Sequence, residues 1–379
     1  MAESKLTPQQ RAQLFGANTR QHRQMLGTQT VNGGGQSMSF TVPKTRLLQA
    51  VTLRVWAEVD FKNNEAVTIT HGDYSMNTFF YRVLRNVYID YNNGFRPVRG
   101  SAEELAMLNM VRFNPRVLCP RSISEVENNG RSMCTVFDKD YEFTKGIKLT
   151  GNTAETHYID FALEIPLTLN DRDPVGLILA QSQESLININ VDIETDAGLI
   201  NSAIKNAYPN LTAEIKSVQV TPMLTSFSIP SSADCFPDLS VLKIVDSRTE
   251  TFTGGGSNQI KLPVGMIYRK LLLHITDKNG KPMKKEDITS NIELIFNGAD
   301  IPYSIDPAHL RYLNISQLGY ELPDGLYLFD FSSYTGMVNL AGSRDYIDTE
   351  RITEFTLRFT TPDAGNVSII SEKISRLVG

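Results

Sequence analysis

Residues 40–55 read Phe-Thr-Val-Pro-Lys-Thr-Arg-Leu-Leu-Gln-Ala-Val-Thr-Leu-Arg-Val, and residues 260–275 read Ile-Lys-Leu-Pro-Val-Gly-Met-Ile-Tyr-Arg-Lys-Leu-Leu-Leu-His-Ile. The two stretches align without a gap. Pro43 falls on Pro263, and an apolar residue falls on an apolar residue at seven further positions. Each stretch has the pattern of a strand, a proline and a second strand. The second half of the chain therefore repeats the plan of the first.

Three further landmarks occur in the same order in both halves. A glycine triplet precedes each stretch, at residues 33–35 and 254–256. Later, residues 86–94 (Asn-Val-Tyr-Ile-Asp-Tyr-Asn-Asn-Gly) resemble residues 291–298 (Asn-Ile-Glu-Leu-Ile-Phe-Asn-Gly), and a helical pattern follows each. Two amphipathic strands match in part by chance, but four landmarks in one order favour duplication. Because a repeat of roughly 200 residues is too long for a solenoid unit, the sequence predicts two copies of one domain.

Alternation of apolar and polar residues predicts the secondary structure of both copies. Val51, Leu53 and Val55 alternate with Thr52 and Arg54, as expected for a strand with one buried face. The same period of two occurs in residues 159–165, 187–193, 327–331 and 355–359. Clusters of Asn, Asp, Gly and Pro separate these segments and predict turns. The pattern indicates an all-β protein made of two β-sandwiches.

Only a few helices are predicted. Ser101 and Glu104 form a capping box that opens a helix over residues 103–111. Residues 307–318 are its counterpart in the second half. Thr7 followed by Pro8 is a typical helix start, because Thr is a good N-cap and Pro suits the first helical position.

The chain divides into four segments on composition. They are an N-terminal basic arm (1–36), a first β domain (37–222), a linker (223–237) and a second β domain (238–379). Gly27 and the first glycine triplet are expected to form a flexible joint between the arm and the first β domain. Residues 1–30 are either a disordered tail or a helical arm docked on a partner.

Composition restricts the class of protein. The chain has 379 residues, 41% of them hydrophobic and 21% charged, which is ordinary globular usage. The net charge of −5 argues against specific nucleic-acid binding as the main role. The sequence shows no signal peptide and no apolar run long enough to span a bilayer, so a cytosol-like compartment is expected.

Residue patterns for catalysis or metal binding are not found in the sequence. The five histidines form no paired zinc motif, and the three cysteines lack the C-x-x-C spacing of a zinc site. Glu164, Asp192 and Glu354 are carboxylates that a glycosidase could use in pairs, but the expected role of each is a solvated strand face. The sequence therefore predicts no catalytic, cofactor-binding or metal-binding residue.

Three features together resemble a known family. Residues 6–14 (Leu-Thr-Pro-Gln-Gln-Arg-Ala-Gln-Leu) open the chain, two β halves of similar plan follow, and residues 325–333 (Gly-Leu-Tyr-Leu-Phe-Asp-Phe-Ser-Ser) form an aromatic strand. In these features the chain resembles the double jelly-roll major capsid proteins of tailless, membrane-containing icosahedral viruses, the tectivirus-like lineage. The resemblance implies two tandem eight-stranded jelly-roll β-sandwiches with a few short helices and an N-terminal helical arm.

The resemblance also implies a structural role without enzymatic activity or cofactors. A homotrimer would form a pseudo-hexagonal capsomer, and capsomers would assemble into the capsid lattice of a virion in the host cytoplasm. Penton proteins and minor capsid or membrane proteins would be further partners. An internal viral membrane would face the N-terminal arm.

The arm supplies the candidate contact residues. Its local charge is positive because four basic residues stand against Glu3 alone; they are Lys5, Arg11, Arg20 and Arg23. We expect these four to contact the lattice or anionic lipid headgroups. The alternative is a carbohydrate-binding or carbohydrate-cleaving β-sandwich protein, such as a virion spike component. A cytosolic scaffold of two β domains is a third reading, and a stable trimer would distinguish the coat protein from both.

Overall fold

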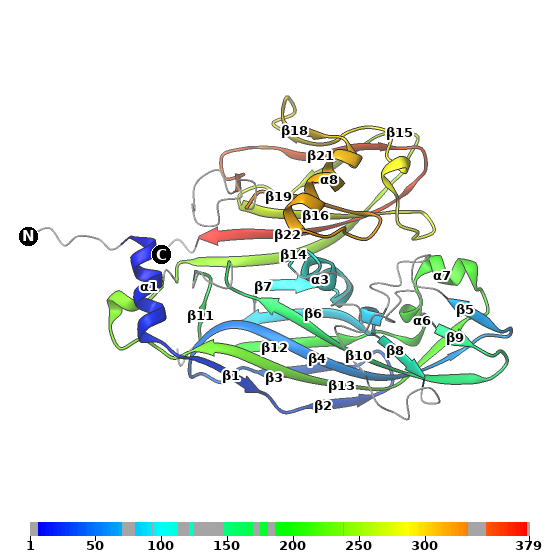
Figure 1. Ribbon diagram of the computed structural model, residues 1–379, viewed down its shortest axis with the longest axis horizontal. Helices are drawn as coiled ribbons and strands as arrows, with labels where there is room; N and C mark the ends of the chain where they lie inside the picture. The colour runs from blue at the N-terminus through cyan, green and yellow to red at the C-terminus, as the bar shows by residue number, and fades with distance from the viewer. Residues whose placement is uncertain are drawn as a thin grey trace, which may run out of the picture.

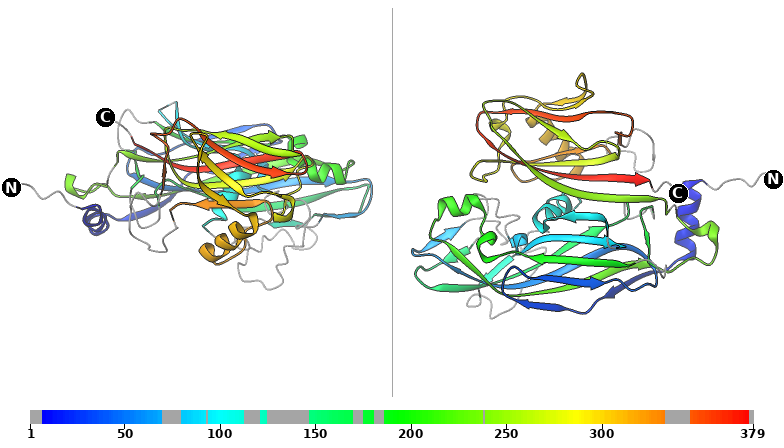
Figure 2. Two further views of the ribbon diagram at one scale, coloured as in Figure 1. Left: turned by 90° about the horizontal axis from the view of Figure 1, so that it is seen from above. Right: turned by 180° about the vertical axis from the view of Figure 1, so that it is seen from behind.

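The computed structural model consists of two β-sandwiches that lie side by side with their strands roughly aligned (Figure 1). It describes residues 7–69, 80–92, 94–112, 121–124, 147–169, 175–180, 186–237, 239–332 and 346–376. A view from behind shows the same two layered bodies, with the N-terminal helix at one end of the first (Figure 2). The all-β prediction is confirmed.

The strands of the first body occupy residues 21–227. They are β1 (Gln21–Met25), β2 (Gln29–Asn32), β3 (Ser37–Thr41), β4 (Leu47–Lys62), β5 (Val67–Ile69), β6 (Leu84–Tyr91), β7 (Phe95–Gly100), β8 (Arg121–Ser124), β9 (Ile147–Leu149), β10 (Ala154–Pro166), β11 (Ile178–Leu179), β12 (Ile187–Ile193) and β13 (Thr212–Phe227).

The strands of the second body occupy residues 241–376. They are β14 (Val241–Phe252), β15 (Gly256–Leu262), β16 (Ile267–Asp277), β17 (Ile292–Phe296), β18 (Asp300–Ile305), β19 (Leu326–Asp330), β20 (Ile347–Asp348), β21 (Phe355–Thr361) and β22 (Gly365–Arg376).

Short helices connect the strands. The α-helices are α1 (Pro8–Asn18), α3 (Ala102–Asn109), α6 (Asp196–Leu199), α7 (Ser202–Ala207) and α8 (Pro307–Leu318), and the 3₁₀ helices are η1 (Phe80–Val83), η2 (Ala233–Cys235) and η3 (Lys285–Asp287). The capping box of Ser101 and Glu104 and the Thr7 N-cap are both present, as predicted.

Both bodies are jelly rolls. The eight strand positions of a jelly roll are lettered B to I in chain order. In the first roll, one sheet has the order B-I-D-G, formed by β1/β2, β13, β4 and β10. The other sheet has the order C-H-E-F, formed by β3, β12, β6 and β7. The second roll pairs B-I-D-G as β14-β22-β16-β19 and C-H-E-F as β15-β21-β17-β18. The two rolls therefore share one topology, that of the eight-stranded jelly roll. The duplication inferred from sequence is a duplication of this unit.

The sequence landmarks occupy equivalent places in the two rolls. The aligned prolines, Pro43 and Pro263, lie between strands C and D, and strand D begins 220 residues apart, at Leu47 and Ile267. The E–F hairpins pair in the same register, with Val87 opposite Gly100 in one and Ile292 opposite Ile305 in the other. The helix that follows strand F is α3 in the first roll and α8 in the second.

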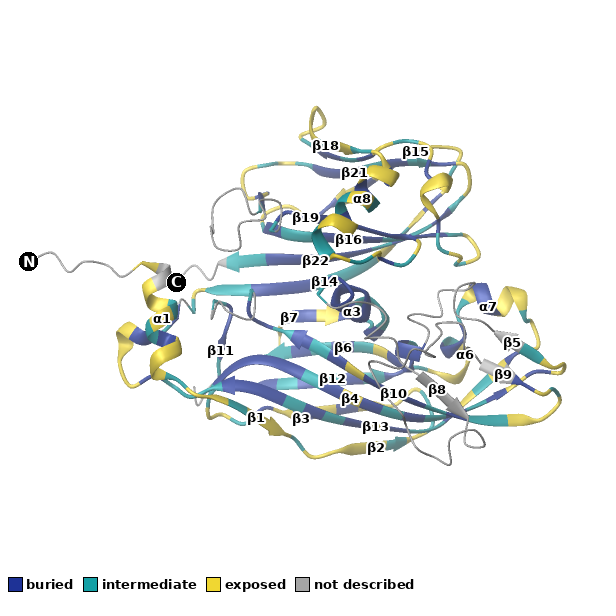
Figure 3. Cartoon of the chain, viewed as in Figure 1, coloured by how far each residue is buried: buried dark blue, intermediate teal, exposed yellow. Residues whose placement is uncertain are grey.

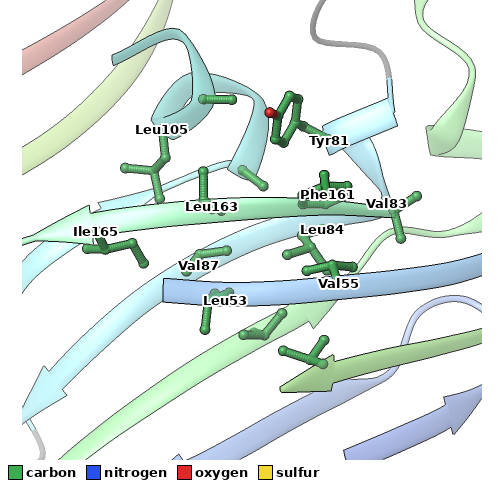
Figure 4. Close-up of a cluster of buried hydrophobic side chains, with 14 of the residues drawn as sticks. Leu53, Val55, Tyr81, Val83, Leu84, Val87, Leu105, Phe161, Leu163 and Ile165 are labelled. Atoms are coloured by element: carbon green, nitrogen blue, oxygen red, sulfur yellow. The ribbon is translucent and has the colours of Figure 1, made fainter. Parts of the chain in front are cut away.

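The core of the first roll lies between its two sheets (Figure 4). Leu53 and Val55 of β4 point inward and are fully buried, next to Leu163 of β10 and Val87 of β6. Complete burial of each such side chain stabilises the fold by about 1.5–3 kcal/mol. The intervening residues of β4 point away from the core, which is the alternation expected from sequence.

Strand pairing moves two predicted boundaries. Residues 21–32, assigned to the arm, form strand B of the first roll and pair with β13. At the other end, β13 continues through Pro222 to Phe227, so its last five residues belong to the sheet rather than to the linker. Pro222 is tolerated in the strand because it lies opposite the break between β1 and β2, where no strand partner needs the missing N–H; its carbonyl accepts a hydrogen bond from the Leu26 amide at 2.8 Å.

The first glycine triplet, predicted as part of a flexible joint, is held in place by the first roll. The Gly33 and Gly35 amides donate to the carbonyls of Lys216 and Glu194, at 3.1 and 3.0 Å. A side chain on Gly34 would lie 2.6 Å from the Glu194 carbonyl oxygen. The triplet is therefore a tightly packed turn between strands B and C. Glycine is needed there for close backbone approach and not for mobility.

Candidate assembly surfaces

The predicted arm residues lie at one end of the first roll. Lys5 is outside the described residues. Arg11 is exposed on α1, Arg20 follows that helix, and Arg23 is exposed on β1. The arm is thus partly a docked helix and partly the first strand of the sandwich.

Phe15 attaches α1 to the first roll. Its ring is 3% exposed and meets the Phe227 ring edge-on, with 5.2 Å between the ring centroids. Leu47 and Leu177 complete this small apolar cluster. Because this cluster fixes the helix, the exposed Arg11 and Arg20 are presented from a defined position at the end of the roll where the chain termini lie (Figure 1).

Strands β7 and β14 join the two rolls directly. They pair in parallel, with Val98 opposite Val245 and Arg99 opposite Asp246. This pairing joins the C-H-E-F sheet of the first roll to the B-I-D-G sheet of the second and makes one nine-stranded sheet. The two rolls are therefore held as one body by backbone hydrogen bonds as well as by side chains.

Helix α3 strengthens this joint. The Glu104 carboxylate accepts hydrogen bonds from the Ser101 amide of its own capping box and from the Ser247 hydroxyl of β14, at 2.9 and 2.6 Å. From the second roll, the Tyr320 hydroxyl donates to the Met110 carbonyl at 2.7 Å. Both ends of α3 are thus tied to the second roll.

A row of alternating charges crosses the second roll where it faces the first. The Glu372 carboxylate of β22 lies 3.1 Å from the Lys243 ammonium of β14 and 3.3 Å from the Arg269 guanidinium of β16. Next along the sheet, Lys270 lies 3.3 Å from Asp330 of β19. The Lys243 and Glu372 side chains are 2% and 5% exposed, so this ion pair is almost completely removed from water.

Electrostatics at this row favour the ionised form of Glu372. Burial by itself raises the pKa of this carboxyl, but Lys243, Lys270 and Arg269 together lower the pKa to about 2. The Lys243 ammonium also donates to the carbonyl of Thr168 in the first roll, at 3.4 Å. The charge row is therefore part of the contact between the two rolls.

The three carboxylates considered for a glycosidase are not brought together. Glu164 lies in β10, Asp192 lies in β12 of another sheet, and Glu354 lies beside β21 of the second roll. Each has a partner of its own: Arg112 at 3.5 Å for Glu164, Ser37 at 2.7 Å for Asp192, and Lys261 at 3.3 Å for Glu354. Paired-carboxylate chemistry has no geometric basis in this arrangement.

The described residues contain no built site for a metal or a small ligand. Across those ranges, no three His, Cys, Asp or Glu side chains gather in a way that would hold a metal ion. The two best-formed cavities there have volumes of about 10 Å³, room for about one water molecule. No described helix is long and apolar enough to cross a membrane.

Comparison with known proteins identifies the fold. No family model matches the chain, and no curated protein matches it. Among solved structures, the chain is similar to the major capsid protein of STIV, the Sulfolobus turreted icosahedral virus, at 13% identity and a TM-score of 0.63, over 94% of this chain and 97% of that one. It is also similar to the Faustovirus major capsid protein (11% identity, TM-score 0.56, 95% and 91% covered) and to that of bacteriophage PM2 (12%, 0.51, 94% and 98%).

These likenesses extend over nearly the whole of both chains, so they include both rolls and the joint between them. The chain therefore has the double jelly-roll fold, the fold of these viral major capsid proteins. The fold that the resemblance implied from sequence is confirmed.

Sequence reasoning missed the charge row between the rolls. Lys243, Lys270 and Glu372 each lie in a strand, where a charged residue is usually read as part of a solvated face. The row becomes apparent only when β14, β22, β16 and β19 are known to be neighbours, and the sequence does not give this strand order. In sequence, a strand face that is exposed to water and a strand face that is buried between the two rolls have the same pattern.

Proposed function

We propose that this protein is the major capsid protein of an icosahedral virus. Two jelly rolls of one topology, joined side by side in one chain, are the single observation that carries the proposal. Three such chains present six rolls around one axis, which gives a nearly hexagonal building block from a threefold homotrimer. The proposed role is structural, with self-assembly as the activity, and the site of action is the virion capsid.

The physical design of the chain suits assembly in many copies. Among the described strands, the inner strands of each sheet are paired on both sides and the edges lie at the ends of each sheet. Unpaired edges promote misdirected strand pairing, so a protein that is made at high concentration benefits from few of them.

The oligomer tests the proposal most directly. We expect the purified chain to scatter light as a particle of three times its 42.4 kDa mass and to show roughly hexagonal outlines in negative-stain images. A protein that stays at the mass of a single chain at every concentration and binds glycans would contradict the capsid role and would favour the carbohydrate-binding alternative.

We further propose that the basic arm contacts an internal viral membrane or a neighbouring capsomer. Arg11, Arg20 and Arg23 are exposed, and each basic group near an anionic membrane surface contributes about 1 kcal/mol of binding. Penton proteins and minor capsid or membrane proteins would be the other partners, with assembly in the host cytoplasm.

Replacing the three arginines with glutamine tests this role of the arm. We expect the triple variant to remain trimeric and to lose binding to vesicles that contain anionic lipid by about a hundredfold, because about 3 kcal/mol of attraction is removed. A matched control replaces Lys278, Lys281 and Lys285 of the second roll with glutamine. Equal loss in both variants would indicate a general charge effect and would overturn the specific role of the arm.

Deletion of residues 1–18 is the complementary test. It removes α1 but leaves β1 and the sandwich intact, whereas a deletion to residue 25 would also remove part of strand B. Normal, membrane-filled particles from the shortened chain would show that neither Lys5 nor Arg11 is required.

A further inference from the structure

The segments that follow strand E in the two rolls have the same spacing of strand, cap and helix. Strand F is Phe-Arg-Pro-Val-Arg-Gly in β7 and Asp-Ile-Pro-Tyr-Ser-Ile in β18, with Pro97 and Pro302 both in third place. A capping residue follows directly, Ser101 or Asp306, and the helix begins at the next residue. A constant offset of 205 residues therefore relates α3 to α8.

Equivalent positions of the two helices differ in burial. The inward positions agree, because Asn109 and its counterpart Asn314 are 3% and 2% exposed. By contrast, Met107 is 2% exposed and its counterpart Tyr312 is 68% exposed. Figure 3 shows the same contrast, with α3 in dark blue and yellow segments along α8.

A second pair of positions shows the same difference. Met110, which is fully buried after α3, corresponds to Ile315 of α8, which is 38% exposed. The backbone of Met110 is held by Tyr320 of the second roll, and α3 lies against β22. The second roll thus covers the outer face of α3, and the described residues contain no third roll to cover the same face of α8.

The face of the second roll that covers α3 has an equivalent face on the first roll. On the second roll it is the outer face of the B-I-D-G sheet, where Leu272, Leu328 and Ile370 are buried away from their own roll's core, in the cluster that contains Met107. On the first roll the equivalent face is formed by β13, β4 and β10, the counterparts of β22, β16 and β19. It carries Trp56 stacked on Tyr158, with 5.5 Å between the ring centroids, and the Arg54 side chain, which is 68% exposed.

We propose that α8 of one copy packs against the outer face of β13, β4 and β10 of a second copy and so repeats between chains the joint that α3 makes within the chain. Tyr312 and Ile315 are the apolar contacts of the helix, and Trp56 and Ala162 lie on the receiving face. The proposal rests on the capsomer proposed above and names its contact surface. The contact is head-to-tail. Three chains close into a ring if the joint within each chain and the contact between chains rotate one roll relative to the next by the same angle.

The free edges of the sheets support the same arrangement. Within the chain, strand F of the first roll pairs with strand B of the second, β7 with β14. Among the described strands, β18 ends its sheet as strand F of the second roll, and β1 and β2 end theirs as strand B of the first. Repetition of the joint places these edges together.

Two variants of the full-length protein test the contact from its two sides. Tyr312→Ser with Ile315→Ser removes the apolar contact of the helix, and Ala162→Arg places a large charged side chain on the exposed receiving face. Both sites lie outside the core of a roll, so circular dichroism and the thermal midpoint should stay close to those of the parent protein. Val264→Ser is the matched control, since Val264 is 40% exposed, like Ile315, but lies in the turn between β15 and β16.

Light scattering over a range of concentrations gives the mass of each protein. We expect the parent and V264S to be trimeric, and both contact variants to shift toward single chains with a trimer at least tenfold weaker. The fluorescence of Trp56, the single tryptophan of the chain, should move to longer wavelength in both contact variants because its face becomes exposed to water.

The outcomes separate the two proposals. If the parent and both contact variants are equally strong trimers, the proposed contact is wrong and the capsomer stands. If the parent is a single chain at every concentration, the proposal of a trimeric capsomer is wrong, and the proposed contact between copies is wrong as well.

Discussion

At the scale of single residues, the Glu372 carboxyl of the charge row has a strongly lowered pKa. Its pKa falls from an ordinary 4.5 to about 2 in the folded chain, because burial is outweighed by Lys243, Lys270 and Arg269. A depressed carboxyl pKa stabilises the folded state above the unfolded pKa, and this contribution is lost as pH falls from about 4.5 toward 2.

Glu372→Gln therefore gives a prediction about acid stability. The variant should be less stable than the parent at neutral pH by about 3 kcal/mol, and the difference should shrink below pH 4.5. Urea unfolding at a series of pH values measures it. Glu286→Gln is the control, because that side chain is 66% exposed, and its small effect should not follow the same curve. A difference for E372Q that stays constant down to pH 2.5 would contradict the assignment.

Lys243→Met removes one partner of the same buried pair. We expect a loss of about 3–5 kcal/mol, because Glu372 is left buried with fewer compensating charges. Adding Glu372→Leu in the same chain should restore much of the loss, since the unpaired charge is then gone. The exposed Lys285→Met should change stability by no more than about 0.5 kcal/mol in the same denaturant titration. Equal effects of K243M and K285M would show that the pair is not coupled.

At the scale of elements, the turn between strands B and C depends on close packing in the first roll. Gly34→Ala should destabilise the protein by about 1–3 kcal/mol, because the new methyl group would meet the Glu194 carbonyl at 2.6 Å and backbone cannot easily yield. Gly256→Ala, in the second triplet, has open space around it and should be nearly neutral. Thermal unfolding of the two variants compares them, and a neutral G34A would mean that the turn can shift.

The elements themselves were largely predictable from local chemistry. The helix over residues 307–318 was predicted with its exact ends. In the structure Pro307 occupies the first helical position, and Gly319 ends the helix with a positive φ at the C-cap. The strand alternation of β4 was also correct. The first glycine triplet was not, because a glycine that is needed for tight packing and one that is needed for mobility look the same in sequence.

At the scale of the whole molecule, the continuous sheet predicts cooperative unfolding. Trp56 reports on the first roll alone, whereas far-ultraviolet circular dichroism reports on both rolls. Because β7 and β14 pair and a buried charge row lies between the rolls, we expect the two signals to change at the same urea concentration. A circular dichroism transition with two steps, of which only one coincides with the fluorescence change, would show that the rolls unfold separately.

The burial of β19 differs from the prediction made from its residue pattern. In residues 327–331 the aromatic residues Tyr327, Phe329 and Phe331 alternate with Leu328 and Asp330. This alternation predicts one exposed face for the strand. In the structure all five residues of β19 are buried, because one face meets its own core and the other meets the first roll. Asp330 is accommodated there because its carboxylate pairs with Lys270 and accepts hydrogen bonds from the amide and hydroxyl of Ser332.

The sequence by itself determined the duplication, the strand and helix positions and the absence of recognisable catalytic motifs, because these follow from local periodicity, capping and residue type. Only the tertiary structure decided that residues 21–32 start the first roll, which strands form each sheet, and how the rolls join. Strand pairing and burial between rolls depend on residues more than a hundred positions apart, such as Lys243 and Glu372, and no local pattern records such a contact. The repeated stretches at residues 40–55 and 260–275 are thus strands C and D of two equivalent rolls. The unequal exposure of α3 and α8 points to the surface where a second copy would bind.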